Sequence, residues 1–362
     1  MERKQFNKIN RLISIIVAVL ASAVYLVTIE PTASFWDCGE FIASSYKLEV
    51  GHPPGNPVFN LFARFFTLFT DAEHAAVAVD AMSAVCSGLT IFFLYLTIVH
   101  FGRRILEKRG RTLTKAAAIG IFGAGIVGAF AFCFSDTFWF SAVEAEVYAM
   151  SSLFTAIVFW AALKWEEQAD LPYANRWLIL ICFLMGLSVG VHLLNLLTVP
   201  AIVFLIYYKK TTKPVTFWRA FGVLAASGVV LGIILFGIIP YLPRFAAGFD
   251  RLFVNGFGAR FDVGAAVFMV VLLVACFLLM LLFRKREKAL AHTITLMFTT
   301  IVIGYSLFTL TVIRASAGTP TNEYQPDNPY TLIRYLGREP YGDNPILYGQ
   351  AYTSPYEIKA TP

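Results

Sequence analysis

The sequence predicts an all-α polytopic membrane protein, and its composition and charge pattern carry the prediction. Hydrophobic residues make up 58% of the 362 residues and charged residues only 14%, whereas about a quarter of a soluble domain is charged. Apolar runs long enough to cross a bilayer recur along the chain. Several of the stretches between them are rich in Lys and Arg, as is typical of cytoplasmic loops. We expect about nine transmembrane helices within residues 1–313 and an extracytoplasmic tail at 314–362.

The first four spans are set by hydropathy and by flanking charge. The start MERKQFNKINR is basic, which places the N-terminus in the cytoplasm. Residues 103–115 hold six Lys or Arg against one Glu and form a second cytoplasmic stretch. The first outer loop then covers residues 30–73, and part of it reads as interfacial helix. We expect these spans at residues 12–29, 75–99, 116–134 and 147–163.

The remaining spans depend on how residues 177–208 cross the membrane. One helix of this length would measure about 48 Å, well beyond a bilayer core of about 30 Å. Two short spans with a turn near His192 keep the basic stretch 209–213 in the cytoplasm, so we favour them. Three further spans follow at 221–239, 265–283 and 293–313. An outer loop with an interfacial piece is expected before residue 265, and the tail after 313 shows no clear helical pattern.

Composition and motifs exclude several function classes. The net charge is +6, but the basic residues stand in short stretches between apolar runs. They form no basic face with interleaved aromatics, so nucleic acid is not expected as a partner. The five cysteines match neither a disulfide framework nor a metal cluster. The sequence contains no nucleophile elbow, phosphate-binding glycine loop, HExxH or paired-cysteine motif. We therefore expect no cofactor and no bound metal.

The first outer loop carries more chemistry than a connector needs. Asp37 and Glu40 stand three residues apart behind Trp36, so in a helix both carboxylates point to one side. Such a pair suits general-base catalysis, in which one acid takes a proton and the other orients it or shifts its pKa. The alternative is a helix start in which Ser34 is the cap and Asp37 faces the helix dipole.

A rigid corner follows these acids. Gly51-His52-Pro53-Pro54-Gly55 fixes the backbone, so His52 could donate to a phosphate or a carboxylate. A rigid turn with an exposed His is an equally good interpretation of His52 alone. The next segment, PVFNLFARFFTLF, predicts an interfacial helix from which Arg64 reaches lipid phosphates, although snorkelling is the default for such an Arg.

Further polar residues are expected on the same face. Glu144 and Glu146 precede the fourth span beside Tyr148 and would bind substrate, or would form structural ion pairs with Arg64 or Arg314. His192 and Asn195 lie at the predicted helix break, where polar groups often satisfy freed backbone. Arg314 ends the last span and is placed to meet an anionic headgroup. These residues outline a cavity that fits a polyprenyl phosphate sugar, with phosphate contacts expected from His52, Arg64, His192 and Arg314.

Four ordered motifs, FWDCGEF, GHPPGNP, FWFSAVEAEVY and GVHLLNLLTVPA, resemble the bacterial membrane family catalogued as domain of unknown function 2723. Its animal relatives are transmembrane O-mannosyltransferases of glycosyltransferase family 117 that act on extracellular IPT domains. The resemblance covers about the whole chain and implies a GT-C fold in a bacterial inner membrane, with a periplasmic active site. Members often continue into a large soluble C-terminal region, whereas this sequence stops at Pro362.

The resemblance implies transfer of mannose from a lipid-phosphate donor to Ser or Thr of exported proteins. By analogy with GT-C enzymes, Asp37 would be the base and Glu40 its neighbour. Two alternatives stay open from the residues. A transporter or lipid flippase would also have many spans, a broken helix and intramembrane acids, although its site should lie nearer the midplane. A membrane scaffold would tolerate loss of both Asp37 and Glu40.

Overall fold

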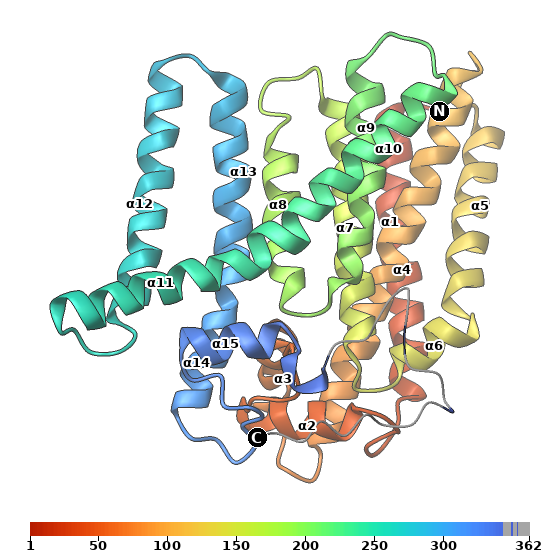
Figure 1. The fold of residues 1–362 in the computed structure, drawn as a ribbon. Helices are drawn as coiled ribbons and strands as arrows, with labels where there is room; N and C mark the ends of the chain where they lie inside the picture. The colour runs from red at the N-terminus through yellow and green to blue at the C-terminus, as the bar shows by residue number, and fades with distance from the viewer. Residues whose placement is uncertain (343–348, 350–352, 354–362) are drawn as a thin grey trace.

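The chain forms a bundle of long helices that carries shorter helices at one end (Figure 1). The computed structural model describes residues 1–342, 349 and 353. Within these residues the structure is helical, and the one β-type contact is an isolated bridge between Val50 and Asn322. The long elements are α1 (Arg3–Val27), α4 (Ala75–Lys108), α5 (Lys115–Cys133), α7 (Val147–Gln168), α8 (Arg176–Val189), α9 (Val199–Lys210), α10 (Phe217–Gly232), α11 (Ile239–Phe257), α12 (Val263–Lys285) and α13 (Ala289–Tyr305).

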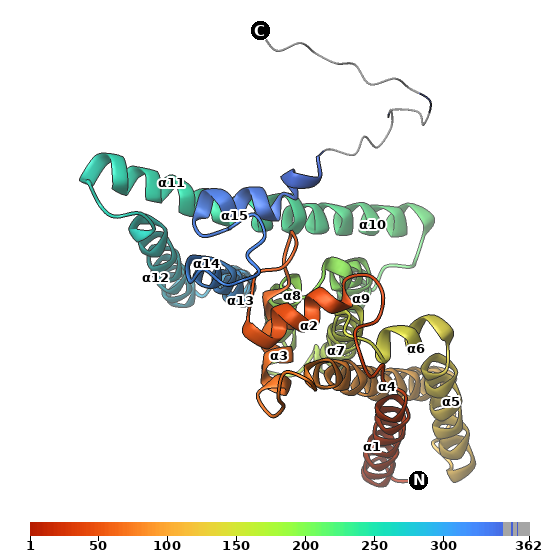
Figure 2. The ribbon, with the colours of Figure 1, turned by 90° about the horizontal axis from the view of Figure 1, so that it is seen from below.

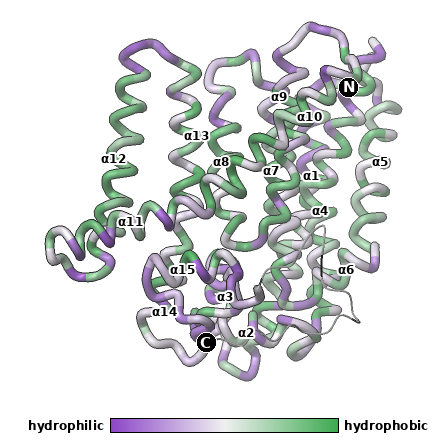
Figure 3. The backbone as a smooth tube through the Cα atoms, in the orientation of Figure 1, coloured by the Kyte–Doolittle hydropathy of each residue, from purple (hydrophilic) through white to green (hydrophobic). Residues whose placement is uncertain are grey.

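Eight helical segments of the described chain are long and apolar enough to cross a membrane, and α8 is a shorter apolar helix beside them. Figure 3 shows hydrophobic residues along the middle of the bundle and hydrophilic residues gathered at its ends. Helices satisfy their own backbone hydrogen bonds, which is what a segment in hydrocarbon requires. The prediction of an all-α polytopic membrane protein is therefore confirmed, with eight such segments in the described chain where about nine spans were expected.

The predicted break near His192 is confirmed. α8 ends at Val189, a 3₁₀ turn covers Leu193–Thr198, and α9 runs back toward the other end of the bundle (Figure 1). α8 packs closely on α13, because Gly186 and Gly304 let the two backbones approach where a side chain would collide with the partner helix. The reversal places residues 190–198 at the end of the bundle that also holds the first loop.

The expected seventh span and the loop after it need a correction. The chain is helical from Phe217 to Phe257, and α11 continues α10 obliquely across the bundle through a π-helical turn at Ile233–Ile238 (Figure 1). The prolines explain the irregular turn, since proline cannot donate to a carbonyl four residues earlier. Pro243 leaves the Ile239 carbonyl free, and the hydroxyl of Tyr305 donates to it at 3.0 Å. The segment expected as an outer loop therefore starts as an amphipathic helix.

The short helices gather at the end of the bundle opposite the N-terminus (Figures 1 and 2). They are α2 (Cys38–Lys47), α3 (Pro57–Thr67), α6 (Asp136–Ala142), α14 (Thr309–Ser316) and α15 (Pro329–Leu336). α2 and α3 confirm the helices expected in the first outer loop. The candidate residues of the first loop, of residues 144–148 and of the helix break thus share one end, and that this end faces outward remains a prediction.

The tail contains ordered helix that sequence analysis missed. Asn328 caps α15, because its side chain accepts from the backbone of Thr331 while the Thr331 hydroxyl accepts from the backbone of Asn328. Pro329 occupies the first helical position, where its missing N–H costs nothing. The hydroxyl of Tyr330 then donates to the Ala247 carbonyl of α11 at 2.9 Å. The part of the tail up to residue 342 therefore packs against the bundle.

Candidate functional site

α2 begins at the candidate acids, as the sequence predicted, but Ser34 does not cap it. Asp37 is the N-cap residue and its side chain makes no capping hydrogen bond. The Ser34 hydroxyl instead donates to Oε2 of Glu144 at 2.8 Å, so the capping interpretation of Ser34 is wrong. Trp36 has a left-handed backbone (φ +63°) and an exposed ring. The Asp37 carboxylate is thereby left free to face the neighbouring corner.

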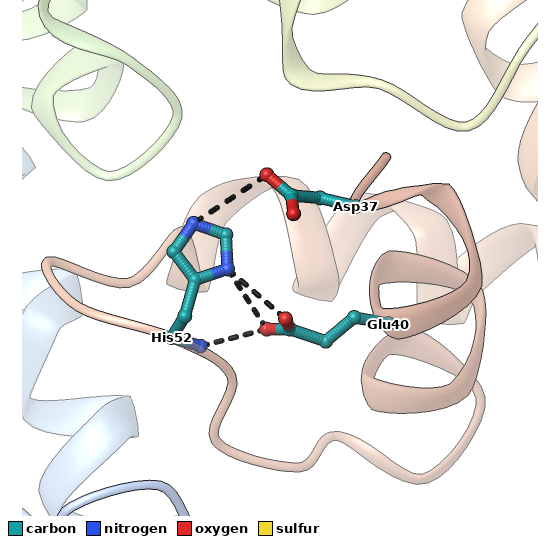
Figure 4. Close-up of side chains that lie close together, drawn as sticks. All are labelled: Asp37, Glu40 and His52. Atoms are coloured by element: carbon teal, nitrogen blue, oxygen red, sulfur yellow. Dashed lines mark hydrogen bonds and ion pairs between the residues drawn. The ribbon is translucent and has the colours of Figure 1, made fainter. Parts of the chain in front are cut away.

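Glu40 and Asp37 approach His52 from its two ring nitrogens (Figure 4). Nδ1 of His52 lies 3.1 Å from both carboxylate oxygens of Glu40, and the His52 backbone N–H donates to Oε1 at 2.7 Å. On the other edge of the ring, Nε2 lies 3.9 Å from Oδ2 of Asp37. His52 and Glu40 are mostly buried, whereas the Asp37 side chain is 56% exposed. Glu40 therefore orients the imidazole, and Asp37 is the acid that a substrate can reach.

The corner is shaped to bring His52 against Glu40. Gly51 lies directly against the Glu40 carboxylate, where a Cβ atom would collide with Oε1. Gly55 has φ +78° and lies against the ring of Tyr335. The Tyr335 hydroxyl donates to the Gly51 carbonyl at 2.5 Å and approaches the His52 carbonyl at 3.1 Å. A residue of α15 thus secures the first loop from a distance of nearly 300 positions in the chain.

The contact between Glu40 and His52 changes the pKa of both groups. The hydrogen bond that His52 donates to Glu40 raises the pKa of His52 above its ordinary value, against the opposing effect of burial. Burial alone would raise the pKa of Glu40, but the hydrogen bonds from the His52 ring and backbone outweigh it and lower that pKa. The arrangement therefore favours an ion pair of a protonated His52 and an ionised Glu40, with Asp37 beside the cation.

Glu144 and Glu146 are held by the first loop and not by an arginine. Glu146 accepts from the Cys38 thiol, with 3.8 Å between the heavy atoms, and from the backbone N–H of Val147 at 3.3 Å. Burial, and next the charge of Asp37, raise the pKa of Glu146 to about 7. In the described part of the chain neither acid pairs with Arg64 or Arg314, so the alternative of structural ion pairs with these arginines is wrong.

Arg64 and Arg314 both bind the carboxyl end of α2. The Arg64 guanidinium donates to the Tyr46 carbonyl and lies 5.3 Å from the centre of the Tyr46 ring. Arg314 donates from Nε to the Leu48 carbonyl at 2.6 Å and from Nη2 to the Lys47 carbonyl at 3.1 Å. The last carbonyls of a helix need such donors. The structure therefore brings neither arginine to His52 and Asp37.

The helix break contributes His192 to the site, beside Tyr148 of α7, but it does not contribute Asn195. The rings of Tyr148 and His192 meet edge to face, with centroids 5.3 Å apart. Nδ1 of His192 accepts from the Leu194 backbone N–H at 3.1 Å, which leaves Nε2 as a donor in the neutral ring. Asn195 is fully buried and donates to the Ser188 hydroxyl. Its position matches the structural interpretation, in which it satisfies groups at the break.

A cavity of about 400 Å³ joins these residues. Its wall includes Asp37, His52, Glu146, Tyr148 and His192, together with apolar residues of α8, α11 and the α13–α14 junction. Trp36, Glu144 and Asn195 do not line it. Glu40 does not line it either, but it contacts His52, which does. The cavity therefore unites five of the predicted site residues at one end of the bundle.

Arg338 is a wall residue that sequence analysis missed. It follows α15 with a left-handed backbone (φ +55°) and has an exposed side chain. Burial, and next the charge of Arg338, lower the pKa of His192. No carboxylate lies within 4 Å of Arg338 in the described residues. The wall thus has an acidic part at Asp37 and Glu146 and a cationic part at Arg338. The sequence sign that could have pointed to Arg338 was the start of α15, the helix that precedes it in the tail.

The same cluster could hold a metal ion. Asp37, Glu40 and His52 each offer a ligand atom, and these atoms lie within 4.8 Å of one another. Metal-binding histidines usually donate one ring N–H to a carboxylate and bind the metal with the other nitrogen. His52 has a carboxylate at one nitrogen and faces the cavity with the other. The ion pair described above uses the same atoms. The expectation of a site without metal therefore stays a prediction.

Comparison with known proteins places part of the chain beside protein O-mannosyltransferases. Residues 37–215 match the family model described as the Protein O-mannosyl-transferase TMEM260 N-terminal domain. The chain is 26% identical over 234 residues to Protein O-mannosyl-transferase TMEM260 of Mus musculus, which covers 63% of this chain and 31% of the relative. It is 23% identical over 247 residues to Protein O-mannosyl-transferase tmem260 of Dictyostelium discoideum, which covers 64% and 27%. No solved structure matches the chain.

The matched stretch contains the candidate acids. It begins at Asp37 and includes Glu40, His52, Glu146 and His192, whereas Arg338 lies beyond it. The chain spans less than a third of the length of these two relatives. The similarity supports a relationship to the protein O-mannosyltransferases, as the four motifs had implied.

Proposed function

We propose that this chain contains the catalytic membrane region of a protein O-mannosyltransferase that takes mannose from a polyprenyl-phosphate donor and transfers it to Ser or Thr hydroxyls of exported proteins. One observation carries the proposal: Asp37, His52 and Arg338 line a single cavity at the end of a membrane bundle. An acid can take the acceptor proton there while cations meet a phosphate. The names of the relatives support mannose as the sugar and protein as the acceptor.

The shape of the surroundings suits a lipid-linked donor. A second cavity of about 490 Å³, mostly apolar, lies between α11, α12, α13, α14 and α15, and Phe308 lines both cavities. An isoprenoid chain would lie in the apolar cavity while its phosphate enters the polar one beside Arg338 and His192. The predicted phosphate contacts of His52 and His192 are kept in this proposal, and Arg338 takes the place of Arg64 and Arg314.

The proposed reaction is one inverting displacement. The acceptor hydroxyl oxygen attacks the anomeric carbon of mannose, and its proton passes to a carboxylate oxygen of Asp37. The bond from that carbon to the phosphate oxygen breaks, and the polyprenyl phosphate leaves with the bonding electrons. The protonated His52, held by Glu40, and Arg338 stabilise the negative charge on the leaving phosphate. Tyr148 and Glu146 would contact the sugar or the acceptor.

The proposal places the site on the extracytoplasmic side of the membrane. The N-terminal sequence and the stretch at 103–115 are basic and lie at the opposite end of the bundle from Asp37 (Figure 1). The positive-inside rule assigns that basic end to the cytoplasm. Exported acceptor proteins would then meet the cavity after translocation, and a bacterial inner membrane is the location that the four motifs imply.

Transfer by the purified protein tests the proposal. The chain, reconstituted in lipid, is incubated with polyprenyl phosphate carrying labelled mannose and with Ser/Thr peptides, in parallel with the glucose donor. We expect labelled peptide from the mannose donor, and loss of that product in Asp37→Asn although thermal unfolding shows that the variant is folded. Asp71→Asn is the matched control, because Asp71 lies in the same loop and pairs only with the exposed His74 in the described chain.

Two results would contradict the proposal. Full transfer by Asp37→Asn would remove Asp37 from the role of base. Movement of labelled lipid between leaflets, without formation of a glycosidic bond with any donor, would favour the transporter alternative.

A further inference from the structure

A second polar cavity lies at the end of the bundle opposite the candidate site. It has a volume of about 450 Å³ and lies between α1, α4 and α7. Its polar lining comes from the first turns of α1 and from the last turns of α4 and α7, at the level where these helices leave the apolar part of the bundle (Figure 3). Nothing in the proposed transfer reaction uses this cavity.

The lining carries an excess of positive charge. Arg3, Arg11, Arg103 and Lys164 line the cavity together with a single carboxylate, Glu167. That carboxylate already accepts from Arg103, from Lys164 at 2.9 Å, and lies 3.4 Å from His100. Glu107, outside the cavity, also pairs with Arg103. Arg3 and Arg11 have no carboxylate within 4 Å in the described residues, so they remain available to an anion.

The other part of the lining is apolar and faces the membrane core. Phe92, Phe93 and Leu96 of α4 lie beside Trp160 of α7. The rings of Phe93 and Trp160 meet at 5.3 Å, and Nζ of Lys164 lies 5.7 Å from the centre of the Trp160 ring. The cavity therefore changes from cationic to apolar along the axis of the helices. A small soluble anion would fill only its cationic part.

We infer that this cavity is a binding site for a phospholipid with an anionic headgroup, distinct from the donor lipid at the other end. The phosphate would lie between Arg3 and Arg11 and the Arg103–Glu167 pair, and an acyl chain would lie along Phe92, Phe93 and Leu96. Basic pockets between transmembrane helices bind such headgroups. Oδ1 of Asn10, which lines the cavity, is buried without a hydrogen-bond partner in the structure. A headgroup hydroxyl, as in phosphatidylglycerol, would supply that donor when the Asn10 side chain turns into the cavity.

Lipid binding to the full chain in detergent tests the inference. Native mass spectrometry measures the affinity for phosphatidylglycerol and for phosphatidylcholine, with inorganic phosphate as a tail-free probe. The cavity variant is Arg3→Gln/Arg11→Gln, because neither side chain pairs with a carboxylate in the described residues. The control is Arg109→Gln/Arg111→Gln, which removes equal charge from exposed positions at the same end. Thermal unfolding verifies that all the proteins are folded.

We expect phosphatidylglycerol to bind the wild type and the control equally, and the cavity variant about 25-fold more weakly, since each of the two cations removed contributes about a factor of five. Leu96→Trp should also weaken binding by filling the apolar part. Equal affinity of the wild type and the cavity variant would overturn the inference. An equal loss of phosphatidylglycerol affinity in the control would overturn it too. The same holds if inorganic phosphate displaced the lipid at equal concentration. None of these results depends on transferase activity.

Discussion

Glu40 holds His52 through three contacts, two from its carboxylate oxygens to Nδ1 at 3.1 Å and one from Oε1 to the backbone N–H at 2.7 Å. A histidine fixed in this way presents its other nitrogen in one direction, and here that direction is toward Asp37. The acid pair read from the sequence is thus divided between two tasks. One carboxylate positions the histidine and the other faces the cavity.

Replacing Glu40 by Gln should lower transferase activity and shift its pH dependence. The hydrogen bond that His52 donates to Glu40 is the largest cause of the raised pKa of His52, so His52 should lose its proton at a lower pH in the variant. We expect the alkaline limb of the pH–rate profile to move to lower pH, and the rate to fall on the order of tenfold to a hundredfold, as is usual when a histidine loses its orienting partner. Steady-state rates from pH 5 to 9 measure both effects.

The matched control for this change is Glu73→Gln in the same loop. Glu73 is exposed and makes no ion pair within the described residues. Its profile should superimpose on that of the wild type. If the Glu40 variant also kept the wild-type alkaline limb, Glu40 would not set the protonation of His52.

The same pair should stabilise the fold in a defined pH window. The pKa of Glu40 is lowered from 4.5, so its contribution is complete above that value and is lost as the pH falls through the folded pKa. The pKa of His52 is raised from 6.5, so its contribution is complete below that value and is lost as the pH rises through the folded pKa. The difference in unfolding temperature between wild type and Glu40→Gln should be largest between pH 4.5 and 6.5. A difference that is constant from pH 3 to 10 would contradict this.

Gly51→Ala should disturb the site by direct collision. A Cβ atom at residue 51 would collide with Oε1 of Glu40, and the carboxylate would have to move away from His52 to make room. We expect transfer activity to fall at least as far as in Glu40→Gln, with the pH shift of that variant. Gly123→Ala in α5 is the control, since a Cβ atom there meets no neighbour. Activity of Gly51→Ala equal to that of the control would show that the close approach is not needed.

Tyr335→Phe should uncouple the tail from the first loop. The buried hydroxyl donates to the Gly51 carbonyl, so its removal costs one hydrogen bond and leaves an acceptor unpaired, about 1–2 kcal/mol of unfolding free energy. Activity should fall as well, because the corner that carries His52 loses its anchor. Thermal unfolding and transfer assays measure the two effects, and Tyr324→Phe, at an exposed position, should change neither.

Local signals explain what could be predicted from the sequence. The apolar runs fixed the long helices, because a membrane segment must be apolar over its whole length. Asp37 and Glu40 are near neighbours in the chain, and the rigid corner with His52 follows within a few residues, so their proximity could be expected. The reversal near His192 followed from charge and length together.

Contacts between distant segments explain what could not be predicted. Arg64 and Arg314 were expected to contact phosphates, but in the structure each donates to carbonyls at the end of α2. No local sequence pattern indicates which helix end a cation will contact. Arg338 reaches the cavity because α15 packs on α11 and on the first loop. The capping pattern at Asn328, followed by proline, was a readable sign of α15. Its position in the bundle was not.

Glu146→Gln should change how stability depends on pH. Burial, and next the charge of Asp37, raise the pKa of Glu146 from 4.5 to about 7. The folded protein therefore binds more protons than the unfolded chain between these values, so its stability falls as the pH rises from 4.5 to 7. A shift of this size corresponds to at most about 3 kcal/mol. Glutamine cannot ionise, and the variant should lack this loss.

The measurement is the unfolding temperature of wild type and Glu146→Gln at pH 5 and at pH 8. We expect the two proteins to be close at pH 5, where the acid is protonated and the amide is a fair replacement. At pH 8 the variant should be the more stable, because the wild type then carries a buried charge beside Asp37. Asp37→Asn should recover part of the wild-type loss at pH 8, since Asp37 is the second cause of the raised pKa. Parallel pH curves for wild type and Glu146→Gln would mean that Glu146 ionises as freely in the folded protein as in the unfolded chain.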